Sequence, residues 1–243
     1  MLEPWISTTT SRRTGTDAAS AAVYAHYNSG RHVSTNGAEL AALLEQLVAG
    51  WPTPIARLAL VGHSMGGLVA RSACVVGEQA GHRWREALRT LVCLGTPHHG
   101  APLERGGNLL ERALGTTRYS APLARLGRLR SAGVTDLRYG NLLDDDWAGV
   151  DRFAPHGDRR TPVPLPTGVA CHAIAATLSA VVEAAPRGDG LVPVDSALGR
   201  HPRRELTLAF PPGHQRVILG AGHMDLLDHP DVAAQLRAWL AAG

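Results

Sequence analysis

The sequence contains no lysine, and all 24 of its basic residues are arginine. Together with abundant alanine, glycine and proline, this composition indicates the codon usage of a GC-rich genome and not a functional choice. The formal net charge is only +3, and the arginines are scattered among acidic residues. A nucleic-acid-binding surface needs a clustered basic face. We therefore expect no nucleic-acid partner.

Long apolar runs are absent as well. No apolar run reaches the length of a membrane-spanning helix, which is about 20 residues. The polar start of the chain lacks the apolar block of a secretory signal. These two absences predict a cytoplasmic protein without an integral membrane segment.

Cysteine is scarce, with three residues in the chain. Cys74, Cys93 and Cys171 lie far apart in apolar segments, and no spacing is that of a zinc site. An odd number of cysteines without close pairs fits buried free thiols in a reducing compartment. The sequence thus predicts no metal centre.

The remaining composition predicts a single α/β domain over residues 1–243. The chain has 243 residues, of which 44% are hydrophobic and 19% are charged, so it is long and apolar enough to bury a sizeable core. Strands are expected at 21–27, 58–61, 90–94, 169–178 and 215–219, and helices at 37–49, 65–79, 191–198 and 230–242. This alternation is typical of a mostly parallel sheet with helices on both faces.

Two segments depart from the alternation. Residues 1–20 carry no periodicity and are expected to be poorly structured. Residues 101–165 lack strand character and hold only short helical pieces at 109–114 and 122–130, so we expect a cap over a cleft. Asn36 is expected to cap the helix at 37–49.

The most informative stretch is Leu58–Ala70, where an apolar strand leads into a helix of small residues. Between them, Gly62-His63-Ser64-Met65-Gly66 matches the pattern G-x-S-x-G. In that pattern a serine stands on a strained strand-to-helix turn, and a side chain at either glycine would collide with the neighbouring backbone. We predict that Ser64 is a nucleophile and that the Met65 amide binds an oxyanion. The alternative is a tight turn with an incidental serine.

Two further polar residues each follow a predicted strand. Asp189 lies in a glycine-flanked loop, and His223 lies in the glycine-rich loop after the last strand. Reactive groups of an open α/β sheet gather past the carboxyl ends of the strands. A serine hydroxyl needs an imidazole to take its proton, and the imidazole needs a carboxylate to orient it. The order Ser64, Asp189, His223 is that of the α/β-hydrolases.

Other acids and histidines compete for these roles. Asp195 falls in a short predicted helix whose side chains point away from the strand end, and Asp144-Asp145-Asp146 is better interpreted as a solvated face. His214 precedes the last strand and so lies at the wrong end of the sheet, while His229 is typical of a helix cap.

Three histidines lie near the predicted nucleophile or the next strand end. His63 is expected to be structural, because inside the turn it points to the side of Ser64. His98 and His99 are expected to line the cleft and not to take part in the chemistry.

Three motifs together resemble a known family: Gly62-His-Ser-Met-Gly-Gly67, Gly95-Thr-Pro-His98 and Asp189-Gly-Leu-Val-Pro193. They are similar to the lipase/esterase branch of the α/β-hydrolases, and most similar to GPI inositol-deacylase-like and bacterial triacylglycerol-lipase-like proteins. The run Tyr27-Asn-Ser-Gly-Arg-His32 and the segment around His223 also resemble bacterial esterases of unassigned substrate. The resemblance implies Ser64 as nucleophile, Asp189 as acid, His223 as base, ester hydrolysis and no cofactor.

One family element has no counterpart in this sequence. The family places a strand ending in His-Gly before the first matching segment, between the strands that correspond to 21–27 and 57–61, and its loop supplies the second oxyanion donor. No His-Gly precedes Ala21, and Leu2–Thr8 is a poor substitute because Pro4 interrupts it. We expect N-terminal strands to be truncated, either because the start of the chain is misplaced or because the protein has lost the element.

Two functions from different classes therefore remain open. The first is a serine esterase or lipase that acts on a small ester or lipid. The second is a catalytically silent hydrolase-like protein that binds a lipid or a protein partner. Acyl transfer to an alcohol or thiol would use the same residues as the first.

Overall fold

A computed structural model of the chain describes residues 6–11, 20–101, 131–151, 157–181 and 187–242. The strands of this structure are β1 (Ile6–Ser11), β2 (Ser20–Ala25), β3 (Leu58–His63), β4 (Leu88–Leu94), β5 (Ala170–Thr177) and β6 (Gln215–Leu219). The α-helices are α1 (Val33–Gly50), α2 (Met65–Gln79), α3 (Trp84–Ala87), α6 (Ala132–Asp136), α7 (Val194–Ala197) and α8 (Pro230–Ala242). Strands β3 to β6 and the helices α1, α2 and α8 lie close to the positions that the hydrophobic periodicity predicts.

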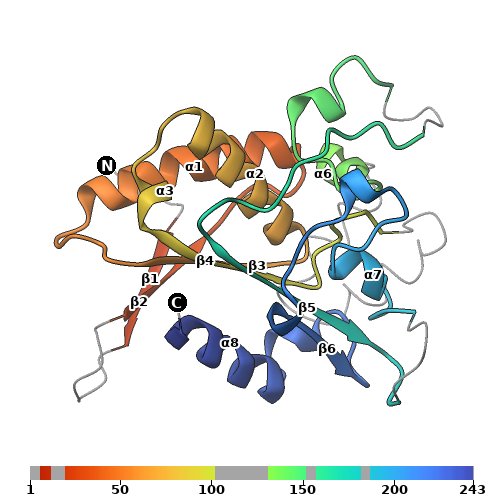
Figure 1. Ribbon diagram of the computed structural model, residues 1–243. Coiled ribbons are helices and arrows are strands. Elements are labelled where there is room, and N and C mark those ends of the chain that lie inside the picture. The colour runs from red at the N-terminus through yellow and green to blue at the C-terminus, as the bar shows by residue number, and fades with distance from the viewer. Residues whose placement is uncertain (1–5, 12–19, 102–130, 152–156, 182–186, 243) are drawn as a thin grey trace.

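Four strands form a parallel sheet in the order β3-β4-β5-β6. Helices α1, α2 and α3 lie on one face of this sheet and α8 lies on the other (Figure 1). The expected architecture, a parallel sheet with helices on both faces, is therefore confirmed. None of the helices in the described ranges is long and apolar enough to cross a bilayer.

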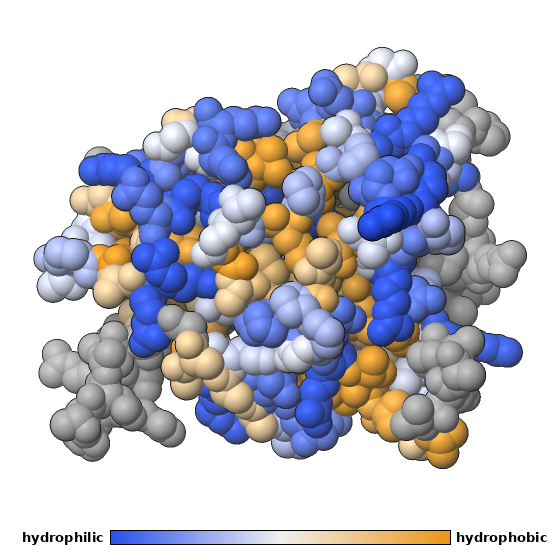
Figure 2. Space-filling model, in the orientation of Figure 1, coloured by the Kyte–Doolittle hydropathy of each residue, from blue (hydrophilic) through white to orange (hydrophobic). Residues whose placement is uncertain are grey.

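Alternating side chains of β4 divide the core between the two faces. Leu91 and Cys93 pack with Ala70 of α2, while Val92 packs with Trp239 of α8. This period of two is what a strand buried on both faces requires. In the view of Figure 2, apolar residues gather in the middle, where the sheet runs, with hydrophilic residues around them.

Strand β3 lies at an edge of the sheet. It pairs with β4, with Val61 opposite Val92, and no other strand in the described ranges pairs with it. Its residue Val61 is 48% exposed. The strand that the family resemblance places beside β3 therefore has no counterpart within the described residues.

The first two strands form a separate antiparallel sheet, with Ile6 opposite Ala25. The expectation that residues 1–20 are poorly structured is thus wrong for Ile6–Ser11, which forms β1. This segment is polar and lacks alternation, but backbone hydrogen bonds to β2 form regardless of the side chains.

Helix α1 begins four residues earlier than predicted, at Val33. Asp136 of α6 accepts a hydrogen bond from the Val33 backbone N–H at 2.8 Å and so replaces a local cap. Asn36 is not the cap; it lies buried inside the helix and donates its Nδ2 to the Asn28 carbonyl oxygen at 3.0 Å. The capping carboxylate comes from far along the chain, so the local pattern could not reveal it.

The described part of residues 101–165 packs against the start of α1. The rings of His32 and Trp147 stack with centroids 3.7 Å apart, and Ser34 donates a hydrogen bond to Asp144 at 2.6 Å. The interpretation of the acidic run as a solvated face is wrong for Asp146. That carboxylate is buried and accepts hydrogen bonds from the backbone N–H groups of Leu142, Leu143 and Thr161. The helical pieces expected at 109–114 and 122–130 lie outside the described residues.

Candidate active site

Ser64 occupies a strained turn between β3 and α2. Its φ of 55° and ψ of −126° make it the one non-glycine residue with positive φ among those the structure describes. Such a conformation costs about 1–3 kcal/mol and persists only where the surroundings hold it. Here the Ser64 backbone N–H donates to the Leu94 carbonyl oxygen at the end of β4, at 2.8 Å. The turn is thereby tied to the neighbouring strand.

Glycines around Ser64 allow this close approach. A Cβ on Gly62 would lie 2.5 Å from the backbone nitrogen of Gly67, and a Cβ on Gly67 would lie 2.0 Å from Thr96 Oγ1. The expectation that a side chain at Gly66 would collide with the neighbouring backbone is wrong. A Cβ there would lie 3.6 Å from the Tyr27 hydroxyl, which is ordinary contact distance. The turn therefore needs glycine at 62 and 67 for space, whereas Gly66 leaves an open position that faces a phenol.

Asp189 and His223 form a buried pair. His223 Nδ1 lies 2.8 Å from Asp189 Oδ2, and each residue is 3% exposed. Because a carboxylate only accepts, His223 Nδ1 carries the proton and leaves Nε2 free to act as a base. The other oxygen, Asp189 Oδ1, accepts the backbone N–H groups of Leu191 at 2.9 Å and Val192 at 2.7 Å. The carboxylate is thus fixed on both oxygens.

The Asp189 loop depends on Gly188. The φ of Gly188 is 127°, and a Cβ there would lie 2.2 Å from the Val192 carbonyl oxygen. The backbone N–H of His223 donates to the Asp189 carbonyl oxygen at 3.1 Å. Backbone and side-chain bonds together hold the loops after β5 and β6 side by side.

His223 also lies close to the end of β4. A Cβ on Gly95 would lie 3.1 Å from His223 Cε1, and Gly95 directly follows Leu94, which anchors Ser64. The three predicted residues therefore gather at the carboxyl edge of the sheet. Within the described residues, no hydrogen bond joins Ser64 Oγ to His223. In enzymes without bound substrate such bonds are often long and tighten only in the complex.

His63 contacts His223 directly. Its Nε2 lies 2.9 Å from the His223 carbonyl oxygen, and the two rings lie 4.6 Å apart. Burial, reinforced by the nearby His223 ring, lowers the pKa of His63 to about 4. His63 is therefore neutral at pH 7, and its Nε2–H donates to the carbonyl.

The start of α2 supplies backbone donors next to Ser64. The Gly67 N–H is taken by the Ser64 carbonyl oxygen at 3.1 Å. The Met65 N–H has no acceptor within the helix, because the first amides of a helix lack intrahelical partners. A developing negative charge on a substrate oxygen would be stabilised at this position.

The competing acids lie elsewhere. Asp195 is exposed and pairs with Arg200 at 3.3 Å, and Asp146 is occupied by backbone donors. Among the described residues, no three histidine, cysteine or carboxylate side chains gather in a way that would hold a metal ion.

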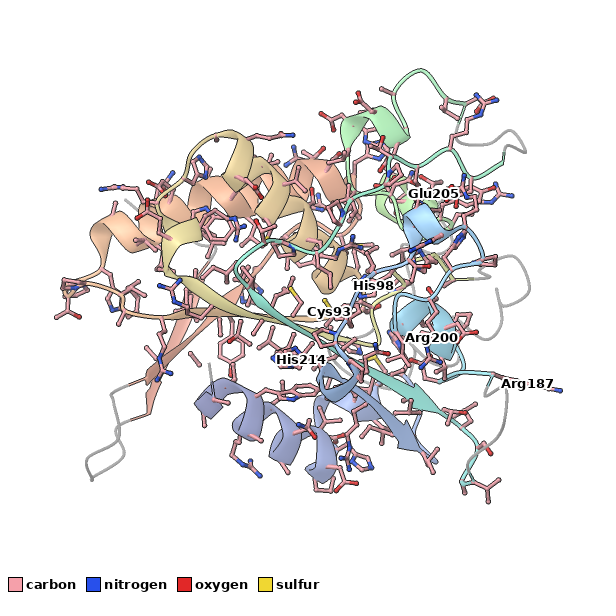
Figure 3. The ribbon with its side chains drawn as sticks, in the orientation of Figure 1. Cys93, His98, Arg187, Arg200, Glu205 and His214 are labelled. Atoms are coloured by element: carbon pink, nitrogen blue, oxygen red, sulfur yellow. The ribbon has the colours of Figure 1, made fainter. Side chains whose placement is uncertain are left out.

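The competing histidines, His214 and His229, have other hydrogen-bond partners. His214 directly precedes β6, and its Nδ1 lies 3.0 Å from the Cys171 carbonyl oxygen. It lies at the other end of the sheet from Arg187, which is in the loop that leads to Asp189 (Figure 3). His229 accepts the Asp231 backbone N–H at 3.2 Å, as a helix cap does.

His98 and His99 line a different cavity from the one expected. Together with Arg71 and Arg160 they surround a space of about 20 Å³, enough for one water molecule. His98 is buried between Arg71 of α2 and Phe210, and Figure 3 shows its place in the interior. Ser64, Asp189 and His223 do not line this cavity.

The three cysteines are buried free thiols. Burial raises the pKa of Cys74 to about 11 and that of Cys93 and Cys171 to about 12. A thiol with so high a pKa carries almost no thiolate at neutral pH and is a poor nucleophile.

Comparison with known proteins identifies the family. The family model described as PGAP1-like alpha/beta domain matches residues 30–165, which is more than half of the chain. The chain belongs to the PGAP1-like family. None of the curated proteins searched matches it. The matched segment of this PGAP1-like chain contains Ser64 and Met65 and ends before Asp189 and His223, whose pairing is evident only from the geometry.

Solved structures of esterases and lipases resemble the PGAP1-like chain. The mature form of the Bacillus licheniformis lipase BlEst2 has 17% sequence identity and a TM-score of 0.52, and the match covers 91% of this chain and 78% of the lipase. A thermophilic esterase has 17% identity and a TM-score of 0.48, with 92% of this chain and 81% of the esterase covered. The likeness to the lipase establishes a shared fold, the α/β-hydrolase fold of esterases and lipases.

Sequence reasoning missed one residue near the site. Sequence patterns place Tyr27 at the end of a predicted strand and in a family-like run but give it no role at the site, yet its hydroxyl approaches Gly66 at the start of α2. The proximity arises because the loop after β2 packs on α2, which no local pattern reveals.

Proposed function

We propose that the protein is a serine esterase that hydrolyses carboxylic esters through an acyl-enzyme. Ser64 is the nucleophile, His223 the general base, Asp189 the acid that orients the imidazole, and the Met65 N–H an oxyanion donor. The observation that carries the proposal is the buried 2.8 Å bond from His223 Nδ1 to Asp189 Oδ2, at the same sheet edge as the strained Ser64 turn. The reaction needs no cofactor, because every proton passes between Ser64, His223, the ester and water.

The chemistry follows from these positions. Ser64 Oγ forms a bond to the ester carbonyl carbon while its proton passes to His223 Nε2, and the carbonyl electrons move onto oxygen. The bond to the leaving alcohol then breaks, and His223 returns the proton to that alcohol. Water, deprotonated in turn by His223, then forms a bond to the acyl carbon. The bond from that carbon to Ser64 Oγ breaks, His223 returns the proton to Ser64 Oγ, and the carboxylic acid leaves. Asp189 stabilises the transient imidazolium without taking its proton.

The test uses the full chain with p-nitrophenyl acyl esters and a fluorophosphonate probe. The probe should label wild-type protein at Ser64, and Ser64→Ala should lose both labelling and turnover. His223→Asn should lose labelling as well. His229→Asn is the matched control, because asparagine retains a capping oxygen for α8 and labelling should persist. Full turnover by Ser64→Ala would refute the proposal.

A catalytically silent, ligand-binding protein is the second candidate. Strand β3 lacks a neighbour on one side within the described residues, so the loop that supplies a second oxyanion donor in related folds has no counterpart there. The same probe separates the two functions. Well-folded wild-type protein that the fluorophosphonate does not label would favour the silent protein.

A further inference from the structure

Tyr27 brings a phenol hydroxyl to the start of α2. Tyr27 directly follows His26 after β2, and its oxygen lies 3.6 Å from the position that a Cβ would take on Gly66. Gly66 is the second residue of α2 and lies two residues after Ser64. Since glycine has no side chain, no side-chain atom of residue 66 lies between the hydroxyl and the backbone at the start of α2.

The phenol ring is held by apolar packing. It is partly buried against a cluster that contains Val33, Met65 and Leu68. Met65 and Leu68 belong to the first turn of α2, so the ring packs directly on the start of the helix. A donor that is already in place costs no reorganisation when charge develops.

The turn after Tyr27 is fixed as well. The backbone N–H of Arg31 donates to the Asn28 carbonyl oxygen at 3.0 Å, and the buried Asn36 side chain donates to the same oxygen at 3.0 Å. Helix α6 closes over this turn, because a Cβ on Gly133 would lie 2.1 Å from the Ser29 carbonyl oxygen. The chain on the carboxyl side of Tyr27 is therefore pinned between α1 and α6.

The Tyr27 hydroxyl makes no hydrogen bond to any residue that the structure describes. Burial raises its pKa to about 12, so the phenol keeps its proton at every pH at which an esterase is assayed. An O–H that stays protonated and unpaired, at the start of the helix that follows Ser64, is available to a ligand oxygen.

We propose that the Tyr27 hydroxyl is the second oxyanion donor, which acts with the Met65 N–H on the same substrate oxygen. This inference rests on the esterase function proposed above. As Ser64 Oγ bonds to the carbonyl carbon, the carbonyl oxygen gains negative charge and accepts both hydrogen bonds. Tyr27 keeps its proton throughout, and the bonds weaken again when the carbonyl re-forms. A side chain thus supplies the donor that related folds take from a loop beside the nucleophile strand.

The experiment compares Tyr27→Phe with Tyr24→Phe, a tyrosine of β2 that is 57% exposed. Removal of one oxyanion donor lowers kcat by about 100- to 1,000-fold. We expect a loss of that order for Tyr27→Phe, with KM changed by less than about threefold, and no loss for Tyr24→Phe. Rates are divided by the concentration of sites titrated with the fluorophosphonate, so that partial misfolding does not count as lost catalysis.

A thionoester substrate distinguishes hydrogen bonding from packing. Sulfur is a weak hydrogen-bond acceptor, so the ratio of oxoester to thionoester turnover reports the donors. This ratio should fall at least tenfold in Tyr27→Phe, whereas a change in packing would slow both substrates alike. An unchanged ratio, or kcat within twofold of the wild type, would overturn the assignment of Tyr27 while the esterase function stands. A wild-type protein that neither reacts with the probe nor hydrolyses esters would overturn both.

Discussion

His63 Nε2 lies 2.9 Å from the backbone carbonyl oxygen of His223. The residue directly before the predicted nucleophile therefore holds the loop that carries the predicted base. His63 is the last residue of β3, and the His223 loop follows β6; these are the two outer strands of the parallel sheet. The hydrogen bond therefore connects the carboxyl ends of β3 and β6, across the ends of β4 and β5.

Loss of this bond should slow the proposed ester hydrolysis. His63→Leu removes the donor to the His223 carbonyl, and the loop can then shift by a fraction of an ångström. We expect kcat for p-nitrophenyl esters to fall about 10- to 100-fold, with little change in KM. His63→Gln keeps an N–H donor and should recover much of the rate. Equal activity of His63→Leu and wild type would contradict a positioning role for His63.

Asp189→Asn should keep the fold and lose activity. The amide can donate to the imidazole and so favours the tautomer with the proton on Nε2, which cannot act as a base. Substitutions of this type lower kcat by about 10⁴-fold. Asp195→Asn, which changes an exposed partner of Arg200, is the matched control and should leave kcat unchanged. Steady-state kinetics of both variants would decide whether Asp189 is the acid.

Gly62→Ala should damage both stability and activity. The new Cβ would lie 2.5 Å from the Gly67 nitrogen and 2.6 Å from the Gly66 carbonyl carbon, and backbone atoms cannot move aside cheaply. We expect a loss of about 1–3 kcal/mol in the free energy of unfolding, as for other overpacked sites, together with slower labelling of Ser64. A Cβ on Gly50 would have no neighbouring atom within 4 Å, so Gly50→Ala should lose neither stability nor labelling rate. Urea denaturation measures the first quantity and probe kinetics the second.

Asp136→Ala should destabilise the start of α1. The substitution removes the acceptor for the Val33 N–H at 2.8 Å and for the Asn141 side chain at 3.2 Å. Loss of one partner leaves buried donors unpaired, and we expect a cost of about 2–4 kcal/mol in the free energy of unfolding. Asp145→Ala alters an exposed carboxylate of the run Asp144–Asp146 and should stay within about 0.5 kcal/mol of the wild type. Similar denaturation midpoints for the two variants would argue against the capping role of Asp136.

Buried histidines should make the protein sensitive to mild acid. Burial lowers the pKa of His63, His99 and His172 to about 4. In the unfolded chain these groups take up protons below about pH 6.5, whereas in the folded protein they stay neutral down to about pH 4. The free energy of unfolding should therefore fall as the pH drops from 6.5 to 4, by at most about 1.4 kcal/mol per pH unit for each such histidine.

Guanidinium denaturation at pH 7 and at pH 5 would measure this loss. His172→Phe keeps an aromatic ring against Trp239 and removes one titrating group, so its stability should depend less steeply on pH. A free energy of unfolding that is equal or greater at pH 5 would contradict the prediction.

Much of the main sheet could be predicted from local sequence. The segments Gln215–Leu219 and Pro230–Ala242 have the expected bounds, since an apolar run and a helical stripe reflect burial on neighbouring elements. The Ser64 turn was predictable for a similar reason. Gly62 and the strand-to-helix sequence around it are requirements of the turn itself, and they are satisfied within a few residues.

The start of α1 and the burial of Asp146 could not be predicted. In both cases the deciding hydrogen bonds join segments that are distant along the chain or come from backbone groups that carry no sequence signal. The same holds for Ile6–Ser11, a polar segment that forms a strand because its backbone pairs with that of β2.

By itself the sequence determined the order of the elements and the loops in which Ser64, Asp189 and His223 lie. Only the tertiary structure decided which side chains meet: that His223 faces Asp189, that His63 holds the His223 loop, and that Tyr27 reaches the start of α2. The physical reason is the distance along the chain over which each effect acts. Steric limits and hydrophobic periodicity act over a few residues and are written in local patterns, whereas a contact between loops depends on how whole strands and helices pack.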